Sequence, residues 1–311
     1  MSNVSRFDIV VVGGGIAGLT AALFAARRGR STLVVVPLLI GGQLATISHV
    51  EDFPGFPEGV AGFDLGPMIQ EQAAAAGAEF RMADVSRIES HDAGWRLATT
   101  EGAVAARAVI IATGSTIRAL NVPGEDRLAG IGVSHCASCD GPLLKGKSVI
   151  VVGAGDSGMQ EALTLADYAQ SVIVIDRSPR VTAQASYERR VRAQPNIAVR
   201  LGTTVVEILG DLAVTGVRIA AGSSENEEQL SADAVFVYAG FVPNSAWLAG
   251  VVPLNSSGHI PIDRWMQTER PGLFAAGDVR ADSACQAVSA AGDGATAAIA
   301  ADRMLRERSI T

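Results

Sequence analysis

Two apolar strands, each followed by a glycine-rich turn and a helical pattern, organise this sequence. The first strand is the run FDIVVV at 7–12, followed by a G-x-G-x-x-G turn at 13–18 and a helical pattern that stops at Gly29. The second is the run SVIVV at 148–152, followed by a G-x-G-x-x-G turn at 153–158 and a helical pattern. Such a turn brings the backbone close to a pyrophosphate at a helix N-terminus. The repeat therefore predicts two dinucleotide sites, or one site and a decayed copy.

Further apolar and helical runs complete each unit. Each glycine turn and its helix are followed by a second apolar strand, at 32–36 and at 172–175. The other predicted elements are strands at 109–114, 234–238 and 272–278, an alanine-rich helix at 64–76 and a small-residue helix at about 288–305. Strands that alternate with helices in this way predict an α/β fold with two Rossmann-like, three-layer domains.

The pattern breaks into polar and turn residues near 115–123 and again near 240–244. We interpret these two breaks as crossovers between domains, with the segment after the second break returning to the first domain. The predicted first domain therefore comprises residues 1–117 plus 245–311. The second domain, residues 118–244, is inserted into it.

Composition narrows the function classes. Of the 311 residues, 48% are hydrophobic and 18% charged, which excludes a disordered chain. The net charge of −7 makes nucleic acid and anionic membrane poor partners. No apolar run approaches about 18 residues, and the N-terminus lacks a signal-peptide pattern. We expect a cytoplasmic protein, and its three cysteines fit a reducing compartment.

A Cys-x-x-Cys pair, Cys136 and Cys139, precedes the second dinucleotide unit. Such a pair can close a small disulfide ring and exchange it with another disulfide. Asp140 follows directly and could move a proton to or from a leaving thiolate. A zinc site would need two further ligands at compact spacing. The remaining candidates are scattered, so no metal is expected: His49, His91, His135, His259 and Cys285.

Other polar residues follow the predicted strands. Asp176 ends the second strand of the second unit, where an acidic residue usually accepts ribose hydroxyls, whereas the first unit has Val36 and Pro37 there. The glycines at 41–42 let the chain pass close to a flat ligand, which Gln43 could bind. Asp278 could accept hydroxyls of a ribityl chain, or could simply cap a helix.

With these motifs in place, the chain resembles the low-molecular-weight thioredoxin reductases over nearly its whole length. The matching motifs are Gly-Gly-Gln at 41–43, Phe-Pro-Gly at 53–55, Ala-Thr-Gly at 112–114, Cys-Ala-Ser-Cys-Asp-Gly at 136–141, Pro-Asn at 243–244, Ala-Ala-Gly-Asp at 275–278 and Gln-Ala at 286–287.

The resemblance implies a homodimeric flavoenzyme with FAD in the discontinuous first domain and a nicotinamide cofactor in the second. Electrons would pass from the nicotinamide through FAD to the disulfide, and from there to thioredoxin or a thioredoxin-like protein. Cys139 would meet the flavin, Cys136 would attack the partner's disulfide, and Asp140 would donate the proton. Rotation about the two crossovers would bring the disulfide and the nicotinamide to the flavin in turn.

The motifs and the resemblance together assign the cofactor contacts. Those for FAD are Gly13, Gly15, Ile16, Ala17, Gly18, Gly42, Gln43, Val85, Thr113, Gly114, Gly277, Asp278, Gln286 and Ala287. Those for the nicotinamide cofactor are Gly153, Gly155, Asp156, Ser157, Asp176 and Arg177.

Two departures from the family pattern bear on the electron donor. Members specific for NADPH carry His-Arg-Arg where this chain has Asp176-Arg177-Ser178. A carboxylate there favours NADH over NADPH, although Arg177 and Arg180 could still bind a 2′-phosphate. Cys285 replaces an arginine, and we expect it to be a buried small residue. His135 either lowers the pKa of Cys136 or is a plain turn residue.

Other functions stay open at this point. Ferredoxin or another flavin could replace the nicotinamide as electron donor. A dithiol oxidase acting on a small metabolite would use the same scaffold, but such relatives often lack a usable nucleotide turn. A flavoprotein that transfers electrons between nicotinamide and ferredoxin would not need the cysteine pair, and a redox-sensing flavoprotein would need no turnover.

Overall fold

The computed structural model describes residues 4–37, 39–92, 94–222 and 227–307. The chain divides into two compact units. Unit 1 comprises Met1–Thr116 and Val242–Thr311, and unit 2 comprises Ile117–Phe241. The assignment of FAD to the first domain and a nicotinamide cofactor to the second stays a prediction.

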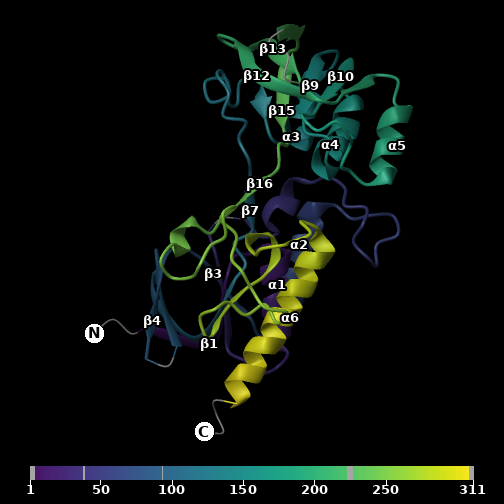
Figure 1. Cartoon of the computed structure of the whole chain (residues 1–311). Coiled ribbons are helices and arrows are strands. Elements are labelled where there is room, and N and C mark those ends of the chain that lie inside the picture. Colours follow the sequence, from purple (N-terminus) through teal and green to yellow (C-terminus); the bar gives the residue numbers. More distant parts are fainter. Residues whose placement is uncertain (1–3, 38, 93, 223–226, 308–311) are drawn as a thin grey trace. The chain divides into compact units, whose positions relative to one another are not determined.

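Unit 1 is built on one seven-stranded sheet (Figure 1). Parallel strands run in the order β3-β2-β1-β6, with β17 added beside the second half of β6. The first half of β6 pairs instead with antiparallel β5, which pairs with β4. The strands are β1 (Ser5–Val12), β2 (Thr32–Val36), β3 (Glu79–Met82), β4 (Val85–His91), β5 (Gly94–Thr99), β6 (Gly102–Ile111) and β17 (Leu273–Ala275).

Alternate side chains of β1 enter two different cores of unit 1. Ile9 and Val11 pack with helices α1 and α6 on one face, whereas Val10 and Val12 pack with β4, β5 and the segment around Leu248 on the other. Helices therefore cover one face of this sheet and mostly extended chain covers the other. The helices of unit 1 are α1 (Ile16–Ala26), α2 (Gly62–Ala75) and α6 (Ala287–Glu307), with short 3₁₀ turns η1 (Gly42–Thr46), η3 (Ala246–Leu248) and η4 (Gly277–Val279).

Unit 2 repeats this plan on a smaller scale (Figure 1). A five-stranded parallel sheet runs in the order β11-β10-β9-β15-β8, and a three-stranded antiparallel sheet runs β12-β13-β14. The strands are β8 (Val133–Ser134), β9 (Ser148–Val152), β10 (Ser171–Ile175), β11 (Ile197–Arg200), β12 (Thr203–Gly210), β13 (Val214–Ala221), β14 (Glu227–Ser231) and β15 (Ala234–Val237).

The central strand β9 again divides its side chains between two cores. Val149 and Val151 pack with the helices α3 (Ala137–Asp140), α4 (Asp156–Ala166) and α5 (Ala185–Ala193), and the turn η2 (Gly141–Leu144) follows α3. Ile150 and Val152 pack with the antiparallel sheet. The predicted α/β class with repeated parallel sheets is confirmed in both units.

The two connecting segments pair with each other as β7 (Ser115–Ile117) and β16 (Phe241–Pro243). Asn244 ties the end of the second segment to the first. Its backbone N–H donates to the Gly114 carbonyl at 2.9 Å, and its side-chain oxygen accepts from Thr116 Oγ1 at 2.6 Å. The chain thus enters and leaves unit 2 through one short ribbon.

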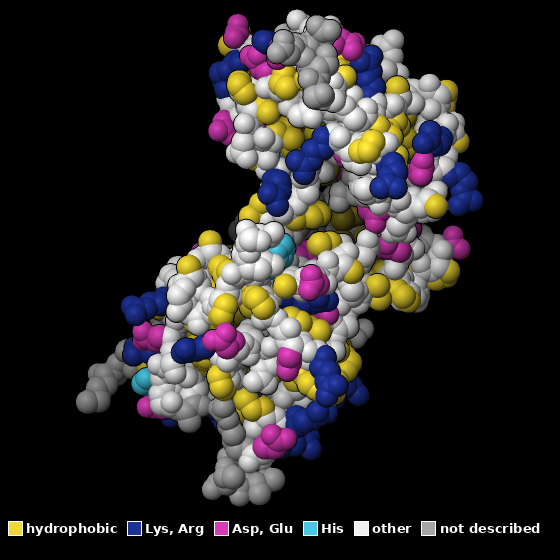
Figure 2. All heavy atoms as spheres, viewed as in Figure 1, with side chains coloured by type: hydrophobic (Ala, Val, Ile, Leu, Met, Phe, Trp, Pro, Cys, Tyr) yellow, Lys and Arg dark blue, Asp and Glu magenta, His cyan; other side chains and the backbone are white. Residues whose placement is uncertain are grey.

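Acidic and basic side chains are intermixed on the face that Figure 2 shows. Among the helices that the structure describes, none combines the length and hydropathy needed to cross a membrane.

A charge cluster anchors the long C-terminal helix α6 of unit 1. The buried Asp302 accepts a hydrogen bond from Arg30 Nε at 2.7 Å and pairs with Arg306 Nε at 3.1 Å and Arg28 Nε at 3.8 Å. Burial alone would raise the pKa of Asp302, but the Arg30 and Arg306 guanidiniums outweigh it and lower the pKa below its ordinary value.

Asp302→Asn should therefore lower the free energy of unfolding at neutral pH by about 1–3 kcal/mol, since three guanidiniums lose their counter-charge. The stabilisation by the wild-type carboxylate is present above its unfolded-state pKa and is lost as the pH falls through its lowered native pKa. Denaturant unfolding at several pH values measures this difference. Glu307→Gln, an exposed acid on the same helix, is the control; equal stability of the two variants at neutral pH would contradict the expectation.

Candidate active site

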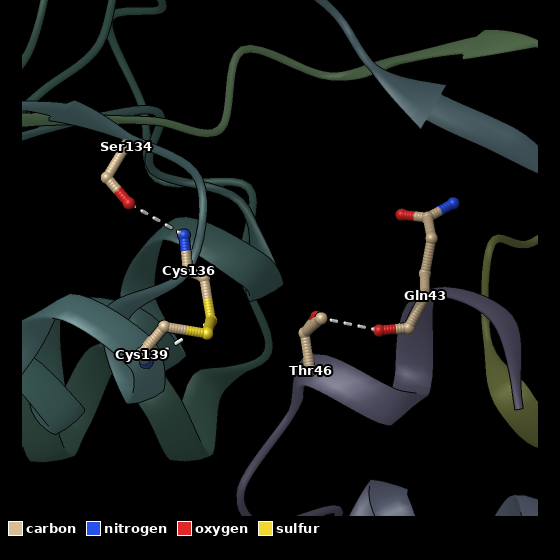
Figure 3. Close-up of a disulfide and its surroundings, with 5 residues drawn as sticks. All are labelled: Gln43, Thr46, Ser134, Cys136 and Cys139. Atoms are coloured by element: carbon tan, nitrogen blue, oxygen red, sulfur yellow. Dashed lines mark hydrogen bonds between the residues drawn. A yellow bond between two sulfur atoms is a disulfide. The ribbon is translucent and has the colours of Figure 1, made fainter. Parts of the chain in front are cut away.

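Cys136 and Cys139 form a disulfide at the start of α3 in unit 2, with their Cα atoms 5.3 Å apart. Cys136 is the N-cap residue, and its Sγ accepts a hydrogen bond from the Cys139 N–H at 3.2 Å. Its own N–H donates to Ser134 Oγ at 3.1 Å (Figure 3). Cys139 is exposed and Cys136 is half-buried. The pair that the sequence singled out is thus a disulfide that a thiol could reach.

Two titratable residues flank this disulfide in the sequence. Asp140 ends α3 and is half-buried, and its N–H donates to the Cys136 carbonyl at 3.1 Å. His135 Nδ1 lies 3.1 Å from the Val237 carbonyl, which holds one nitrogen of the ring against the backbone. The proton-transfer role of Asp140 stays a prediction.

The glycine turn between β1 and α1 has the geometry of a pyrophosphate cradle. A Cβ atom at Gly13, whose φ is +117°, would fall on the Ala112 carbonyl, and one at Gly18 would fall on the Gly13 carbonyl. At Gly15, by contrast, an added Cβ meets no atom within 4 Å. Two glycines are therefore required by packing and the third leaves open space at the helix N-terminus, which fits the dinucleotide expected there.

Hydrogen bonds connect several of the predicted FAD contacts across unit 1. Gln43 Nε2 donates to the Ser115 carbonyl at 2.7 Å and contacts Ser115 Oγ at 3.0 Å, and the Gln43 carbonyl accepts from Thr46 Oγ1 at 2.9 Å (Figure 3). Ser115 Oγ in turn donates to Asp278 Oδ2 at 3.3 Å, and Ser283 Oγ donates to Asp278 Oδ1 at 3.2 Å. Segments after β2, β6 and β17 thus meet at the carboxyl edge of the sheet.

Asp278 lies in η4 and does not cap α6. Burial raises the pKa of this carboxyl above its ordinary value, although the hydrogen bonds from Ser283 and Ser115 oppose the shift. A buried acceptor of this kind suits hydroxyl donors of a ligand.

Asp293 supports the same loop from α6. Its Oδ2 accepts from the Gly277 N–H at 3.1 Å and from Arg280 Nε at 2.7 Å. The Asp293 and Arg280 side chains are both largely buried. A Cβ at Gly277 would come within 2.9 Å of the Ala17 Cβ, so this loop packs directly on α1.

The other predicted FAD contacts lie on or beside these elements. Thr113 Oγ1 donates to the Asn244 carbonyl at 2.8 Å. Val85, at the start of β4, packs against the core formed by Val10 and its neighbours, and no described contact joins it to the Gln43–Asp278 chain. The remaining residues occupy the start of α1, the turns at 42 and 114, and the start of α6: Ile16, Gly42, Gly114, Gln286 and Ala287.

The second glycine turn, between β9 and α4 of unit 2, has the same geometry as the first. A Cβ at Gly153 would fall on the Tyr238 carbonyl and one at Gly158 on the Gly153 carbonyl. Gly155 has only Thr182 Oγ1 nearby, 3.7 Å from an added Cβ. This turn therefore also has room for a pyrophosphate.

Asp176 is bound to the glycine turn of its own unit. Oδ2 accepts from the Ala154 N–H at 2.6 Å and Oδ1 accepts from the Ser178 N–H at 2.7 Å. Arg177 and Arg180 are exposed. The carboxylate thus lies at the turn, and its contact with an adenosine ribose stays a prediction.

Asp156 and Ser157 begin α4, and Asp156 Oδ1 accepts from the Gln184 N–H at 2.7 Å. This contact draws the segment before α5 toward the glycine turn.

Cys285 corrects one expectation. The residue is exposed and free, not buried, because it lies in the loop before α6 with a φ of +52°. Partial desolvation of the thiol by its neighbours and the nearby Asp278 charge raise its pKa, so it is a poor nucleophile at neutral pH.

The sequence motifs do not single out two residues that organise these sites: Ser115 and Asp293. Ser115 directly follows the Ala-Thr-Gly motif at the end of a buried strand, which is a usable signal. Asp293 stands inside a helix among small residues, and only its burial in the fold singles it out.

Comparisons with known proteins agree with this geometry. A family model for pyridine nucleotide-disulphide oxidoreductases matches residues 7–295. Thioredoxin reductase of Treponema pallidum is 38% identical over 298 residues, covering 95% of this chain and 96% of the relative. Thioredoxin reductase of Mycolicibacterium smegmatis is 39% identical over 302 residues, covering 97% of each.

Solved structures are similar over the same length. The crystal structure of Lactococcus lactis thioredoxin reductase in its FR conformation has a TM-score of 0.94 at 32% identity, covering 97% of this chain and 99% of that one. The crystal structure of T. acidophilum thioredoxin reductase has a TM-score of 0.92 at 35% identity, covering 98% and 99%.

The two kinds of glycine in the first turn can be separated by substitution. Gly15→Val should keep the fold but lose the bound dinucleotide, because its side chain enters the open space at the helix N-terminus. Gly18→Val, the matched control, should lose both, because its side chain collides with the Gly13 carbonyl. Flavin absorbance of the purified proteins and thermal unfolding by circular dichroism measure the two effects. Full flavin content in Gly15→Val would remove this turn from the binding site.

Proposed function

Since the chain belongs to the pyridine nucleotide-disulphide oxidoreductase family, as one of its thioredoxin reductase type, we propose that it reduces the disulfide of thioredoxin or a thioredoxin-like protein. The observation that carries this proposal is the accessible Cys136–Cys139 disulfide at the N-terminus of α3. An acidic residue, Asp140, stands directly beside it in the sequence.

The family implies the use of FAD and a pyridine nucleotide. The open side of Gly15 would hold the FAD pyrophosphate and Asp278 its ribityl hydroxyls, whereas the open side of Gly155 would hold the nicotinamide dinucleotide. When bound, FAD supplies a carrier that accepts a hydride and gives up an electron pair.

The cysteines perform the sulfur chemistry. Two electrons break the S–S bond and leave the Cys136 thiolate and a Cys139 sulfur that takes up a proton, which it gives up again before it attacks Cys136. The Cys136 thiolate attacks one sulfur of the partner's disulfide and forms a mixed disulfide, and Asp140 gives a proton to the sulfur that leaves. The Cys139 thiolate then attacks Cys136, which restores the Cys136–Cys139 bond and releases the reduced partner. Electrons and sulfur bonds balance in this cycle.

The paired segments β7 and β16 suit a hinge in this proposal. The disulfide and the second glycine turn belong to unit 2, whereas the proposed flavin contacts belong to unit 1. Both therefore have to reach one cofactor in turn, by rotation about the single ribbon that joins the units. We further propose that the protein is a homodimer, as its resemblance to thioredoxin reductases implies, and that it acts in the cytoplasm.

Cys139→Ser tests the role of the disulfide. The variant should retain its flavin absorbance and lose disulfide reduction, because no intramolecular bond can store the electron pair. Turnover is followed as nicotinamide oxidation with a thioredoxin as substrate. Cys285→Ser, which removes the free exposed thiol, is the matched control and should remain active. Unchanged turnover in Cys139→Ser would take the pair out of the mechanism.

A separate experiment identifies the electron donor. Anaerobic mixing with NADH and then with NADPH shows which donor bleaches the flavin, and bleaching by neither would favour ferredoxin or a second flavin. The position of Asp176 on the glycine turn supports NADH, because its charge repels a 2′-phosphate.

Asp176→Asn should shift the ratio of kcat/KM for NADH over that for NADPH by about tenfold toward NADPH, since the amide keeps the size of the side chain and removes its charge. Arg189→Gln, an exposed residue on α5, serves as the control. An unchanged ratio would discredit the ribose contact.

A further inference from the structure

A buried carboxyl lies in unit 2 on the interior side of the redox helix. Glu161 is on α4, only 7% of its surface is exposed, and it sits among the apolar residues that α4 buries. Helix α4 packs against α3, the helix that carries the redox pair. The backbone N–H of Ala137, which is fully buried and follows Cys136 directly, lies near the Glu161 carboxyl and lowers its pKa, but by less than burial raises it.

The polar groups around this carboxyl are incompletely paired. Among the residues that the structure describes, Glu161 Oε2, the Tyr238 hydroxyl and Ser138 Oγ are buried side-chain atoms with no hydrogen-bond partner. No basic side chain of the described chain forms an ion pair with Glu161. Burying a carboxylate that has no counter-charge costs free energy, and burying the neutral, protonated carboxyl costs less.

The other titratable groups on the neighbouring elements are Tyr238, which follows β15, Asp140 and Cys139 on α3, Cys136 at its N-cap and His135 just before it. Of these, Asp140 and a reduced cysteine can carry a negative charge and so disfavour a carboxylate nearby. Burial raises the pKa of Glu161 to about 7. Burial and the Glu161 charge also raise the pKa of the Tyr238 hydroxyl, so this hydroxyl stays neutral.

We propose that Glu161 is a positioning residue for the disulfide, whose carboxyl takes up a proton when the Cys136–Cys139 bond is reduced and releases it when the bond reforms. Reduction adds two electrons, breaks the S–S bond and puts negative charge on a sulfur at the start of α3, the helix against which α4 and Glu161 pack. Like charges in a buried site repel strongly, so the carboxylate accepts one proton from solvent as the thiolate forms. Reoxidation reverses both changes.

This inference rests on the proposed redox role of the Cys136–Cys139 bond, but its test needs neither a nicotinamide nor a partner protein. The flavin-containing protein is reduced anaerobically with excess dithiothreitol, freed of reductant, and alkylated with iodoacetamide over a range of pH. Peptide mass spectrometry separates Cys136 and Cys139 from the free Cys285.

Glu161→Gln should shift the pH midpoint of alkylation of the Cys136–Cys139 pair downward by about half to one unit, which makes alkylation near pH 8 about three- to tenfold faster. Glutamine keeps the size of the side chain and the acceptor for the Ala137 N–H but carries no charge. Glu161→Leu, which also lacks the acceptor, should shift the midpoint in the same direction. Asp167→Asn removes an exposed charge at the end of the same helix and should leave it unchanged.

The pH dependence of the midpoint potential provides a second measurement. At a pH where reduction leaves one thiolate, the wild-type protein should take up two protons per two electrons, one on the other sulfur and one on Glu161. Glu161→Gln should take up only one, so its potential, measured against dithiothreitol, should fall less steeply with pH. Alkylation midpoints that agree in wild type, Glu161→Gln and Asp167→Asn, or equal slopes in wild type and Glu161→Gln, would overturn the role of Glu161 alone. Failure of dithiothreitol to reduce the bond would instead overturn the proposed function.

Discussion

In each unit, close backbone-to-backbone contact in the glycine turn holds the following helix against the sheet. In unit 1, Gly18 packs against the Gly13 carbonyl and Gly13 against the Ala112 carbonyl, and Gly158 and Gly153 repeat this arrangement in unit 2. Any side chain at these positions would push the helix off the sheet. The same approach leaves the N-terminal amides of α1 and α4 facing open space. Packing and ligand binding are therefore both constraints on one turn, and different glycines of that turn meet them.

The strands that the sequence predicts best are those buried on both faces. Thr32–Val36 and Ser148–Val152 are uninterrupted apolar runs bounded by polar or glycine residues, and the structure has the same bounds. The antiparallel strands carry a much weaker pattern. In β4 only Ile88 is fully buried and Val85 is partly buried, so five of its seven residues give no hydrophobic signal. This segment is a strand because it pairs with β5, and that pairing depends on the tertiary structure and not on the local sequence.

Local spacing predicts the parts of the sites whose chemistry lies within a few residues. The disulfide and both glycine turns are of this kind. Ser115 is different, because it joins Gln43, 72 positions earlier, to Asp278, 163 positions later. Its role depends on three strands ending at one edge of the sheet, which no periodicity encodes. Glu161 is similar, since an acid inside a helix is ordinarily assigned to a solvent-facing position.

Two buried acids, Asp278 and Glu161, show how the units differ in their electrostatics. Burial raises both pKa values, but Asp278 has hydroxyl donors on both oxygens and a guanidinium nearby, which oppose the shift. Glu161 has an oxygen without a hydrogen-bond partner among the described residues and only the nearby Ala137 amide to oppose the shift. A site that binds neutral hydroxyls works best with a constant charge. A site where sulfur gains and loses electrons benefits from a charge that can vary, and the less supported acid lies on the helix that packs against the one carrying the sulfurs.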